Sequence, residues 1–433
     1  MNSKLRAALD DSNITSVEKR AGRRTGRRRR PFELASLCFL DFFSNSLPSR
    51  ARHRWLFGAS VWLVVVTVIH WVTDGTGGSG LTEEEFDAWA VKVNSAITFV
   101  EYTLTFLVSI AALVTLLGDR YPPLNHAFHG VNMRTVCGVA LSLAIGWLVN
   151  RGPKTAARAF GPATFGVLLL VWVMIIATVW KLGLHLPQLD PRAFSGRYLN
   201  LTLSGYSKLL ALMTGLEVFA NLVSAYEANP EKRSRMAFHS LLIAMGTTCI
   251  TMLIVGPAVL IVADPSNGKV SVFTQAMDYL LPHPLPYIGT LIGIVVLASA
   301  AEASAQGLQN LALGLRLRHY IPARLGRRNK FVADLPLWPE VGIVCGCFIF
   351  VGTKEETYLS LYAVGVFILL SMTGWATAKR SFRLQRGKFG SRHLPVLGGS
   401  LIAALLITAA TLIIFKERFT EGAWAYCLLI PAI

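Results

Sequence analysis

Four charged residues stand inside long apolar stretches of this sequence: Glu101, Lys208, Glu217 and Glu302. Each such charge costs roughly 2.5 to 3.5 kcal/mol at the centre of a membrane helix and is normally kept for a purpose. A buried carboxyl can exchange a proton or hold a desolvated monovalent cation. Lys208 lies near the end of its stretch, where a long side chain reaches the lipid interface. The three glutamates are therefore the first candidates for a binding site.

Polar neighbours surround the first of these acids. Glu101 opens the run Glu-Tyr-Thr-Leu-Thr and lies four residues before Thr105. Residues four apart share one face of a helix, so the carboxylate and the hydroxyl could share one desolvated ion. This pair gives the sharpest hypothesis of a cation or proton site.

Small residues accompany the other two acids. Glu217 follows Thr214 and Gly215, whereas Glu302 lies in the small-residue run Ala298–Ala305. Glycine within a span either permits close helix packing or breaks the helix and frees backbone groups to bind a solute. We expect a broken helix beside Glu217 and tight packing around Glu302.

Membrane helices are the elements that would position these residues. The 433-residue chain is 53% hydrophobic and only 15% charged, well below the roughly 25% charged share of soluble domains. Its apolar runs are continuous and approach the ~20 residues that cross a bilayer, which favours helices over a membrane barrel. We predict an all-α polytopic protein of about 11 to 12 spans, the first and last incomplete. The spans are expected at 55–73, 95–117, 136–150, 160–181, 205–227, 240–262, 286–313, 338–352, 357–376, 394–415 and 423–433.

The basic excess is concentrated at the start of the chain. Of the net charge of +17, residues 1–54 carry thirteen Lys and Arg against five Asp and Glu. Residues 1–31 are interpreted as a disordered cytoplasmic tail against anionic lipid, followed by a transmembrane permease domain at 32–433. Nucleic-acid binding is not expected, because no aromatic residues alternate with the arginines.

Loop charge sets the predicted orientation in a cell membrane. From Arg151 onward, strongly basic loops alternate with mixed ones, and basic loops remain in the cytoplasm. The same alternation, continued backwards, places an acidic loop of Glu83–Glu85 and Asp87 inside and Arg50, Arg52 and Arg54 outside, against the charge rule. A short first span at Phe32–Pro48 would restore a cytoplasmic N-terminus; the alternative is that the first 90 residues have diverged from a normal transporter.

Other chemistries lack support in the sequence. The six cysteines are scattered through apolar runs, so neither a disulfide framework nor a zinc site is indicated. Nucleotide-binding loops of the GxxxxGK[ST] type and catalytic signatures such as HExxH and GxSxG do not occur. We therefore expect neither an enzyme nor a cofactor, and movement of a solute would draw on an ion gradient.

Five segments together resemble the amino acid, polyamine and organocation (APC) superfamily of permeases, most of all its KimA-like potassium importers. They correspond to the third span, the turn after the fourth, the sixth span with its closing turn, the tenth span and the start of the twelfth. In that order they are Glu101–Ser109, Asn150–Lys154, Thr214–Asn221 with Asn229–Pro230, Leu361–Phe367 and Glu421–Trp424. The resemblance covers roughly residues 90 to 433.

The resemblance implies a LeuT-like fold of two inverted five-helix repeats plus two further spans, with the solute near the midplane. In the KimA-like branch an acid and a Thr on the third helix and a Thr on the sixth contact the ion, and the matching residues are Glu101, Thr105 and Thr214. An Asp is usual where Glu101 stands, an Asn where Glu302 stands and a Pro where Gln309 stands. The glycine-rich motif of the first span is not recognisable.

The combined expectation is a proton-coupled secondary transporter that moves a small amino acid or K⁺ by alternating access. Its partners would be the lipid bilayer and the solute, H⁺ would be the coupling ion, and a homodimer stays open. A degenerate, non-transporting or regulatory membrane protein is the alternative. The expected binding residues are Glu101, Tyr102, Thr105, Thr214, Gly215, Glu217 and Glu302, with K⁺ at Glu101, Thr105 and Thr214 as one option and no other metal.

Overall fold

The computed structural model describes residues 77–128, 131–151, 153–184, 196, 270–317, 319–322, 337–385 and 394–428, with short pieces between 239 and 264. Within these ranges the ordered elements are helices, apart from a two-residue antiparallel pair, β1 (Ala127–Phe128) and β2 (Val131–Asn132). The α-helices are α4 (Gly77–Arg120), α5 (Met133–Asn150), α6 (Pro153–Leu182), α10 (Val272–Leu280), α11 (Leu285–Leu317), α12 (Leu337–Phe350), α13 (Glu355–Gln385) and α14 (Leu394–Arg418). Two 3-10 turns complete them, η2 (Pro122–Asn125) and η5 (Ala423–Ala425).

Six helices are long and apolar enough to cross a membrane, which confirms the all-α polytopic class for the described part of the chain. They match the spans expected at 95–117, 136–150, 160–181, 286–313, 357–376 and 394–415. Two further apolar helices are shorter than these six. Helix α12, in the span expected at 338–352, has only 14 residues, or about 21 Å at 1.5 Å per residue. The other is Gly246–Val259, in the span expected at 240–262. The tail at 1–31 and the spans at 55–73 and 205–227 lie outside the described residues, as do residues 429–433 of the span expected at 423–433.

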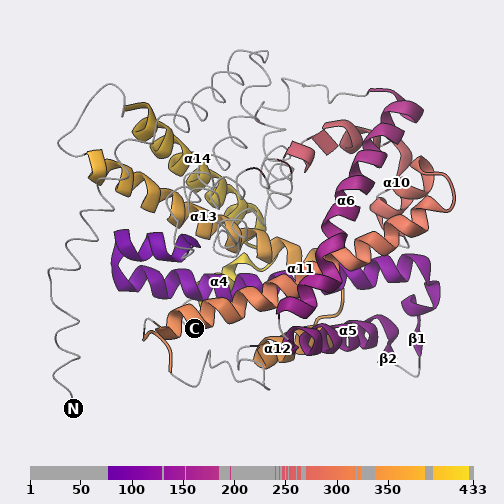
Figure 1. Cartoon of the computed structure of the whole chain (residues 1–433), viewed down its shortest axis with the longest axis horizontal. Coiled ribbons are helices and arrows are strands. Elements are labelled where there is room, and N and C mark those ends of the chain that lie inside the picture. Colours follow the sequence, from indigo (N-terminus) through magenta and orange to yellow (C-terminus); the bar gives the residue numbers. More distant parts are fainter. Residues whose placement is uncertain are drawn as a thin grey trace.

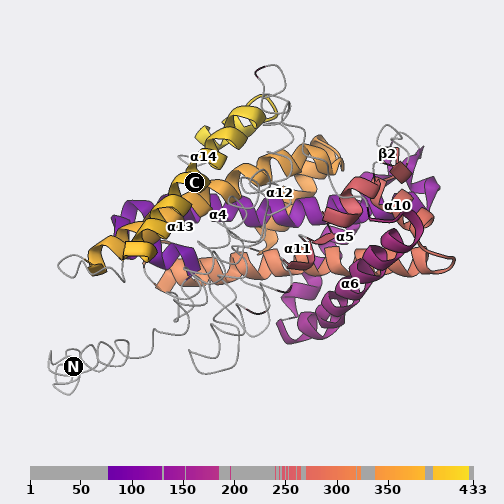
Figure 2. The ribbon, with the colours of Figure 1, turned by 90° about the horizontal axis from the view of Figure 1, so that it is seen from above.

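Helix α4 is the central element of the bundle. Figure 1 shows α4 and α11 side by side across the molecule, with α13 and α14 on one side and α5 and α12 on the other. Seen from above in Figure 2, α4 again runs through the middle of the ribbon. In its apolar span 72% of the residues are buried, and 65% in that of α13, against 22–33% in the other four spans. Polar residues on α4 are therefore the most secluded from lipid and water.

Close packing joins α4 to α11, as expected for the small-residue run. Ala301 and Ala305 are fully buried against Phe106 and Leu107 of α4. A Cβ added to Gly307 would lie 2.6 Å from the ring of Tyr102, so glycine is needed for this approach. The small residues around Glu302 thus bring two helix backbones together.

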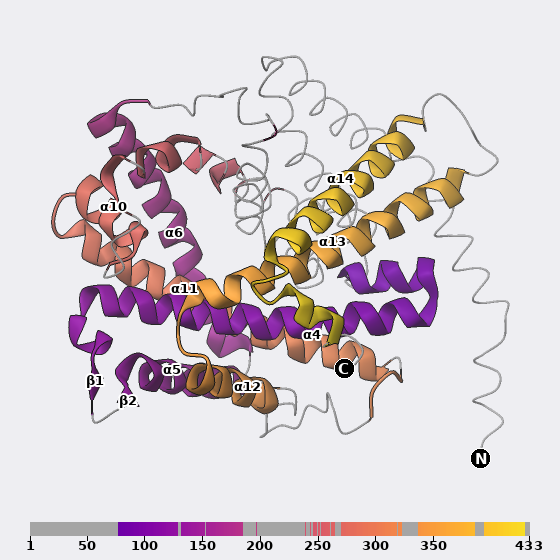
Figure 3. The ribbon, with the colours of Figure 1, turned by 180° about the vertical axis from the view of Figure 1, so that it is seen from behind.

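Helices α5 and α12 form a second close pair, antiparallel and beside α4 (Figure 3). A Cβ at Gly146 would lie 2.9 Å from Val341, and one at Gly138 would lie 3.3 Å from Phe348. The two contacts fix the register, with the end of α5 beside the start of α12.

Polar contacts join α13 to α14. The hydroxyls of Ser371 and Thr408 lie 2.9 Å apart, and the Trp375 indole N–H donates to the Thr408 hydroxyl at 2.9 Å. The Thr411 hydroxyl donates to the Phe367 carbonyl at 2.9 Å. Such contacts hold two apolar helices in one register, because lipid offers the polar groups no alternative partner.

The expected acidic loop is wrong: Glu83–Glu85 and Asp87 lie in helix α4, which begins at Gly77. Glutamate favours helix, and the buried Glu85 carboxylate is held by an ion pair of 2.6 Å to Arg383 at the end of α13. Lys379 donates to the Glu85 carbonyl and lies over the Phe86 ring at 4.8 Å. The acidic run therefore lies at the same end of the bundle as the basic end of α13. This pairing explains how acidic residues can lie on the side that the loop charges assign to the cytoplasm.

Neutralising either partner of this ion pair should have unequal effects. The Glu85 side chain is 1% exposed and that of Arg383 is 58% exposed, so Arg383→Gln leaves a buried carboxylate with a weaker counter-charge. We expect Arg383→Gln to cost about 2 kcal/mol of stability and Glu85→Gln clearly less. Thermal unfolding in detergent measures both variants, and the double variant should resemble Glu85→Gln. Equal losses from the two single changes would contradict this account.

A second polar cluster fixes the opposite end of α4. The Asp119 carboxylate accepts hydrogen bonds from the Ser271 amide and hydroxyl and from the Thr274 hydroxyl at the start of α10. Arg120 pairs with Asp278 of α10 at 2.8 Å and donates to the Thr290 hydroxyl of α11 at 2.9 Å. Helix α4 is thus tied to α13 at its beginning and to α10 and α11 at its end.

Candidate functional site

Four glutamates are buried in the described part of the chain, each at most 6% exposed: Glu85, Glu101, Glu302 and Glu340. Glu85 is paired with Arg383, and the Glu302 carboxylate accepts a hydrogen bond from the Gln306 side-chain amide one turn later on α11. The predicted burial of Glu101 and Glu302 is therefore borne out. Glu340 was missed by sequence reasoning, because it stands at the edge of its apolar run.

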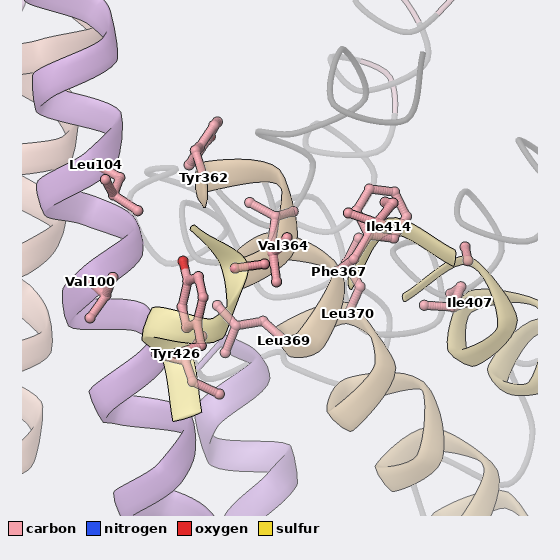
Figure 4. Packing of buried hydrophobic residues seen from close by; sticks show 14 of the residues in the cluster. Val100, Leu104, Tyr362, Val364, Phe367, Leu369, Leu370, Ile407, Ile414 and Tyr426 are labelled. Carbon is pink, nitrogen blue, oxygen red and sulfur yellow. The ribbon is translucent and has the colours of Figure 1, made fainter. Parts of the chain in front are cut away.

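Glu101 lies in the middle of α4 and is 2% exposed. Its carboxyl interacts electrostatically with the Tyr426 hydroxyl, which comes from the segment after α14. Tyr426 is itself only 1% exposed and packs among Val100 and Leu104 of α4 and Val364 of α13 (Figure 4). An acid and a phenol from opposite ends of the described chain thus lie within electrostatic range of each other inside the bundle, without a hydrogen bond between them.

Helix α13 supplies the third wall of this site through Gly365. A Cβ at Gly365 would overlap the Tyr426 hydroxyl and lie 3.0 Å from its ring carbon Cζ. Gly365 belongs to the Leu-Tyr-Ala-Val-Gly-Val-Phe segment and Glu101 to Glu101–Ser109, so two of the five segments that carry the resemblance contribute to this site, and Tyr426 follows a third by two residues. We name this group, Glu101, Gly365 and Tyr426, the acid–phenol site.

A left-handed turn delivers Tyr426 to the site. Gly422 has φ of +118° and precedes the 3-10 turn η5. Only glycine adopts this backbone readily. Sequence reasoning selected Glu421–Trp424 but not Tyr426, because a tyrosine near an apolar terminus resembles an ordinary interfacial residue. The available signal was Gly422, a glycine four residues after the last residue of α14.

Thr105 lies one turn beyond Glu101, as predicted, but its hydroxyl proton is already engaged. The hydroxyl donates to the Glu101 backbone carbonyl at 2.8 Å. The hydroxyl oxygen can therefore still coordinate a cation through its lone pairs, but it has no proton left to donate to a ligand. An ion shared by Thr105 and the Glu101 carboxylate would be coordinated by oxygen atoms alone.

Tyr102 points to a different helix. Successive residues of an α-helix are rotated by about 100°, and the Tyr102 ring packs on Gly307 of α11. The expected binding residues Glu101 and Tyr102 are thus divided between the α13 and α11 sides of α4. Thr214, Gly215 and Glu217 lie outside the described residues.

The chemistry available at the acid–phenol site is proton exchange or the binding of a single cation. Among the residues that the structure describes, no three His, Cys, Asp or Glu side chains gather as they would around a multivalent metal ion. One carboxyl beside one phenol carries at most one negative charge before the phenol ionises. That charge matches one proton or one monovalent cation.

Comparisons with known proteins were made at three levels. No protein-family model and no curated protein matches this chain. Among solved structures, the chain is similar to the crystal structure of MhsT in complex with L-phenylalanine, with 15% sequence identity and a TM-score of 0.44 over 84% of this chain and 89% of that chain. A likeness at this level assigns neither a fold family nor a substrate.

Proposed function

We propose that the chain is a secondary active transporter of the APC superfamily with a LeuT-like arrangement, which takes up a small amino acid or K⁺ by alternating access with proton coupling. One observation carries the proposal: a carboxyl that is 2% exposed in the middle of the most buried span, within electrostatic range of a buried phenol. Burying an ionisable group inside a membrane bundle is costly and typical of ion and solute pathways.

In this proposal Glu101 is the coupling group. When the acid is protonated, a neutral carboxyl meets the neutral Tyr426 hydroxyl, and both remain buried at low cost. When the proton leaves, the carboxylate requires a donor, water or a cation. The protonated and deprotonated states therefore favour different packing of α4 against α13 and the Tyr426 segment. Such a difference is what links proton binding to a conformational change.

Substrate would be held by residues near this acid. Thr105 offers hydroxyl lone pairs, while Thr214 and Gly215, with Glu217 nearby, are proposed to contribute a hydroxyl and freed backbone groups, as in discontinuous helices. Glu302 is assigned a supporting role, because its carboxylate is already bonded to Gln306. A site made of oxygen atoms favours K⁺ as the cargo. A small amino acid is favoured because amino acids are the commoner cargo of the superfamily.

Uptake into proteoliposomes tests the proposal. The full chain is reconstituted, an inward proton gradient is imposed, and uptake of radioactive Rb⁺, as a K⁺ substitute, and of a mixture of labelled amino acids is followed. Accumulation that collapses with a protonophore supports proton-coupled transport, and the labelled species identifies the cargo class. Absence of uptake for every label, in protein that keeps its thermal unfolding transition, would favour a non-transporting membrane protein.

A further inference from the structure

Glu340 lies in the first turn of α12 and is the most secluded acid in the described residues, with 0% exposure. Neither of its carboxylate oxygens has a hydrogen-bond partner there. The other three buried glutamates, Glu85, Glu101 and Glu302, each interact with a polar group. Glu340 is the buried glutamate for which the described residues show no such interaction.

The described residues around Glu340 are mostly apolar. It shares the buried face of α12 with Leu337, Val341 and Val344, which pack with Ile145 and Val149 of α5. A carboxylate placed here would lose its hydration and gain no donor, and an isolated buried charge is neutralised instead. The partial positive charge of a helix N-terminus acts on Glu340 but is weaker than this loss of hydration.

A second orphaned oxygen lies at the same end of the α5–α12 pair. The Asn150 Oδ1 atom, in the last residue of α5, is buried and has no hydrogen-bond partner among the residues that the structure describes. Gly146 faces Val341 and Trp338 across the pair, and Asn150 follows Gly146 by one helical turn, about 6 Å along the axis. The antiparallel register therefore places Asn150 and Glu340, both without a hydrogen-bond partner among the described residues, at the same end of the helix pair.

The described charged and titratable groups near this end are otherwise engaged. The Arg151 guanidinium stacks over the Trp147 ring at 3.8 Å, and Glu302 of α11 is bonded to Gln306. At the far end of α12, the Tyr358 hydroxyl of α13 lies within bonding distance of the Cys347 and Gly352 carbonyls. The other titratable groups on the paired helices are the thiols Cys345 and Cys347 of α12 and Cys137 of α5, and the Arg134 guanidinium, which lies at the opposite end of α5 and donates to the Thr115 hydroxyl at 2.9 Å. The segment of α4 that packs here contributes apolar residues.

We propose that Glu340 is a proton-binding site between α5 and α12, separate from the acid–phenol site, in which the protonated carboxyl donates its O–H to Asn150 Oδ1. One proton then removes the buried charge and supplies the donor that Asn150 lacks. A monovalent cation fits less well, because the two residues offer three oxygens, two of them on one carboxyl. Release of the proton leaves a charge that separates the end of α5 from the start of α12, so the site couples local pH to this helix pair.

Infrared spectroscopy of the full chain in lipid tests this inference directly, and its readout does not require transport. The carbonyl stretching band of a protonated carboxylic acid should be present at neutral pH and lose the intensity of one carboxyl in Glu340→Gln. In Asn150→Leu the same band should shift in frequency, because the carboxyl loses its acceptor. Glu421→Gln, which alters an acid paired with Arg418 at the surface, is the matched control and should leave the band unchanged.

Stability supplies the second measurement. Because the unfolded chain releases this proton above about pH 4, where an exposed glutamate ionises, rising pH should favour unfolding of the wild type until the buried acid itself ionises. The melting temperature of Glu340→Gln should depend less on pH and equal or exceed that of the wild type at neutral pH. An unchanged infrared band in Glu340→Gln would overturn the proposal, as would a K⁺- or Na⁺-dependent rise in melting temperature that this variant loses, since that result identifies a cation site.

Discussion

Replacing Glu101 with glutamine should lower the initial rate of proton-driven uptake by roughly 100-fold, the size expected when a buried charge-assisted interaction is lost. Glutamine keeps the shape of a protonated glutamate, so the 2%-exposed position and its contact with the Tyr426 segment should survive. It cannot release a proton, and the coupled step therefore stops. Proteoliposome uptake under an imposed proton gradient measures the loss.

Two comparisons make this result specific to Glu101. Glu421→Gln, an acid whose side chain is 48% exposed beside Arg418, should retain nearly full uptake. Counterflow exchange of labelled for unlabelled solute, which needs no net proton movement, should be reduced less than driven uptake in Glu101→Gln. Driven uptake that is unaltered by this substitution would remove Glu101 from the coupling mechanism.

Adding a methyl group at Gly365 should destabilise the bundle by about 1 to 3 kcal/mol, the usual cost of overpacking a filled core. The new Cβ would overlap the Tyr426 hydroxyl, and neither side of the contact has room to move, because Tyr426 is 1% exposed. Thermal unfolding of Gly365→Ala in detergent, followed by tryptophan fluorescence, should show a clearly lower melting temperature.

The companion variant Tyr426→Phe locates the clash. Removing the hydroxyl leaves the ring carbon Cζ at 3.0 Å from the new Cβ, so Gly365→Ala with Tyr426→Phe should recover part of the stability. Gly346→Ala in α12, where an added Cβ meets nothing within 4 Å, should be neutral or stabilising by about 0.5 to 1 kcal/mol. A melting temperature for Gly365→Ala that matches this control would show that Gly365 is not tightly packed.

Run length and composition were sufficient to predict six spans, because crossing a bilayer imposes a length that local sequence must meet. The same reasoning found Glu101 and Glu302, which stand well inside their runs. It missed Glu340, which follows Trp338 and Pro339 at the start of a short helix and is buried by the register of α12 on α5. Burial of this kind depends on contacts distant in sequence and is not encoded in hydropathy.

The roles of neighbouring residues were also set by tertiary contacts. Thr105 was correctly placed one turn from Glu101, but its hydroxyl bonds to the backbone. The acidic run at Glu83–Glu85 was assigned to a loop because its basic partner, Arg383, lies almost 300 residues away. The resemblance of Glu421–Trp424 indicated the correct segment, yet the side chain that reaches the site, Tyr426, became apparent only from the turn at Gly422.

The two polar clusters at the ends of α4 constrain how the molecule can change shape. Arg383 binds the beginning of this helix to α13, and Asp278 binds its end to α10, which precedes α11. If α13 moves away from α11, one of the two clusters must open. Helix α4 then moves either with α13 or with α10 and α11, according to which cluster stays closed. Screening by salt weakens the exposed partners most, so ionic strength becomes a control over which group of helices α4 follows.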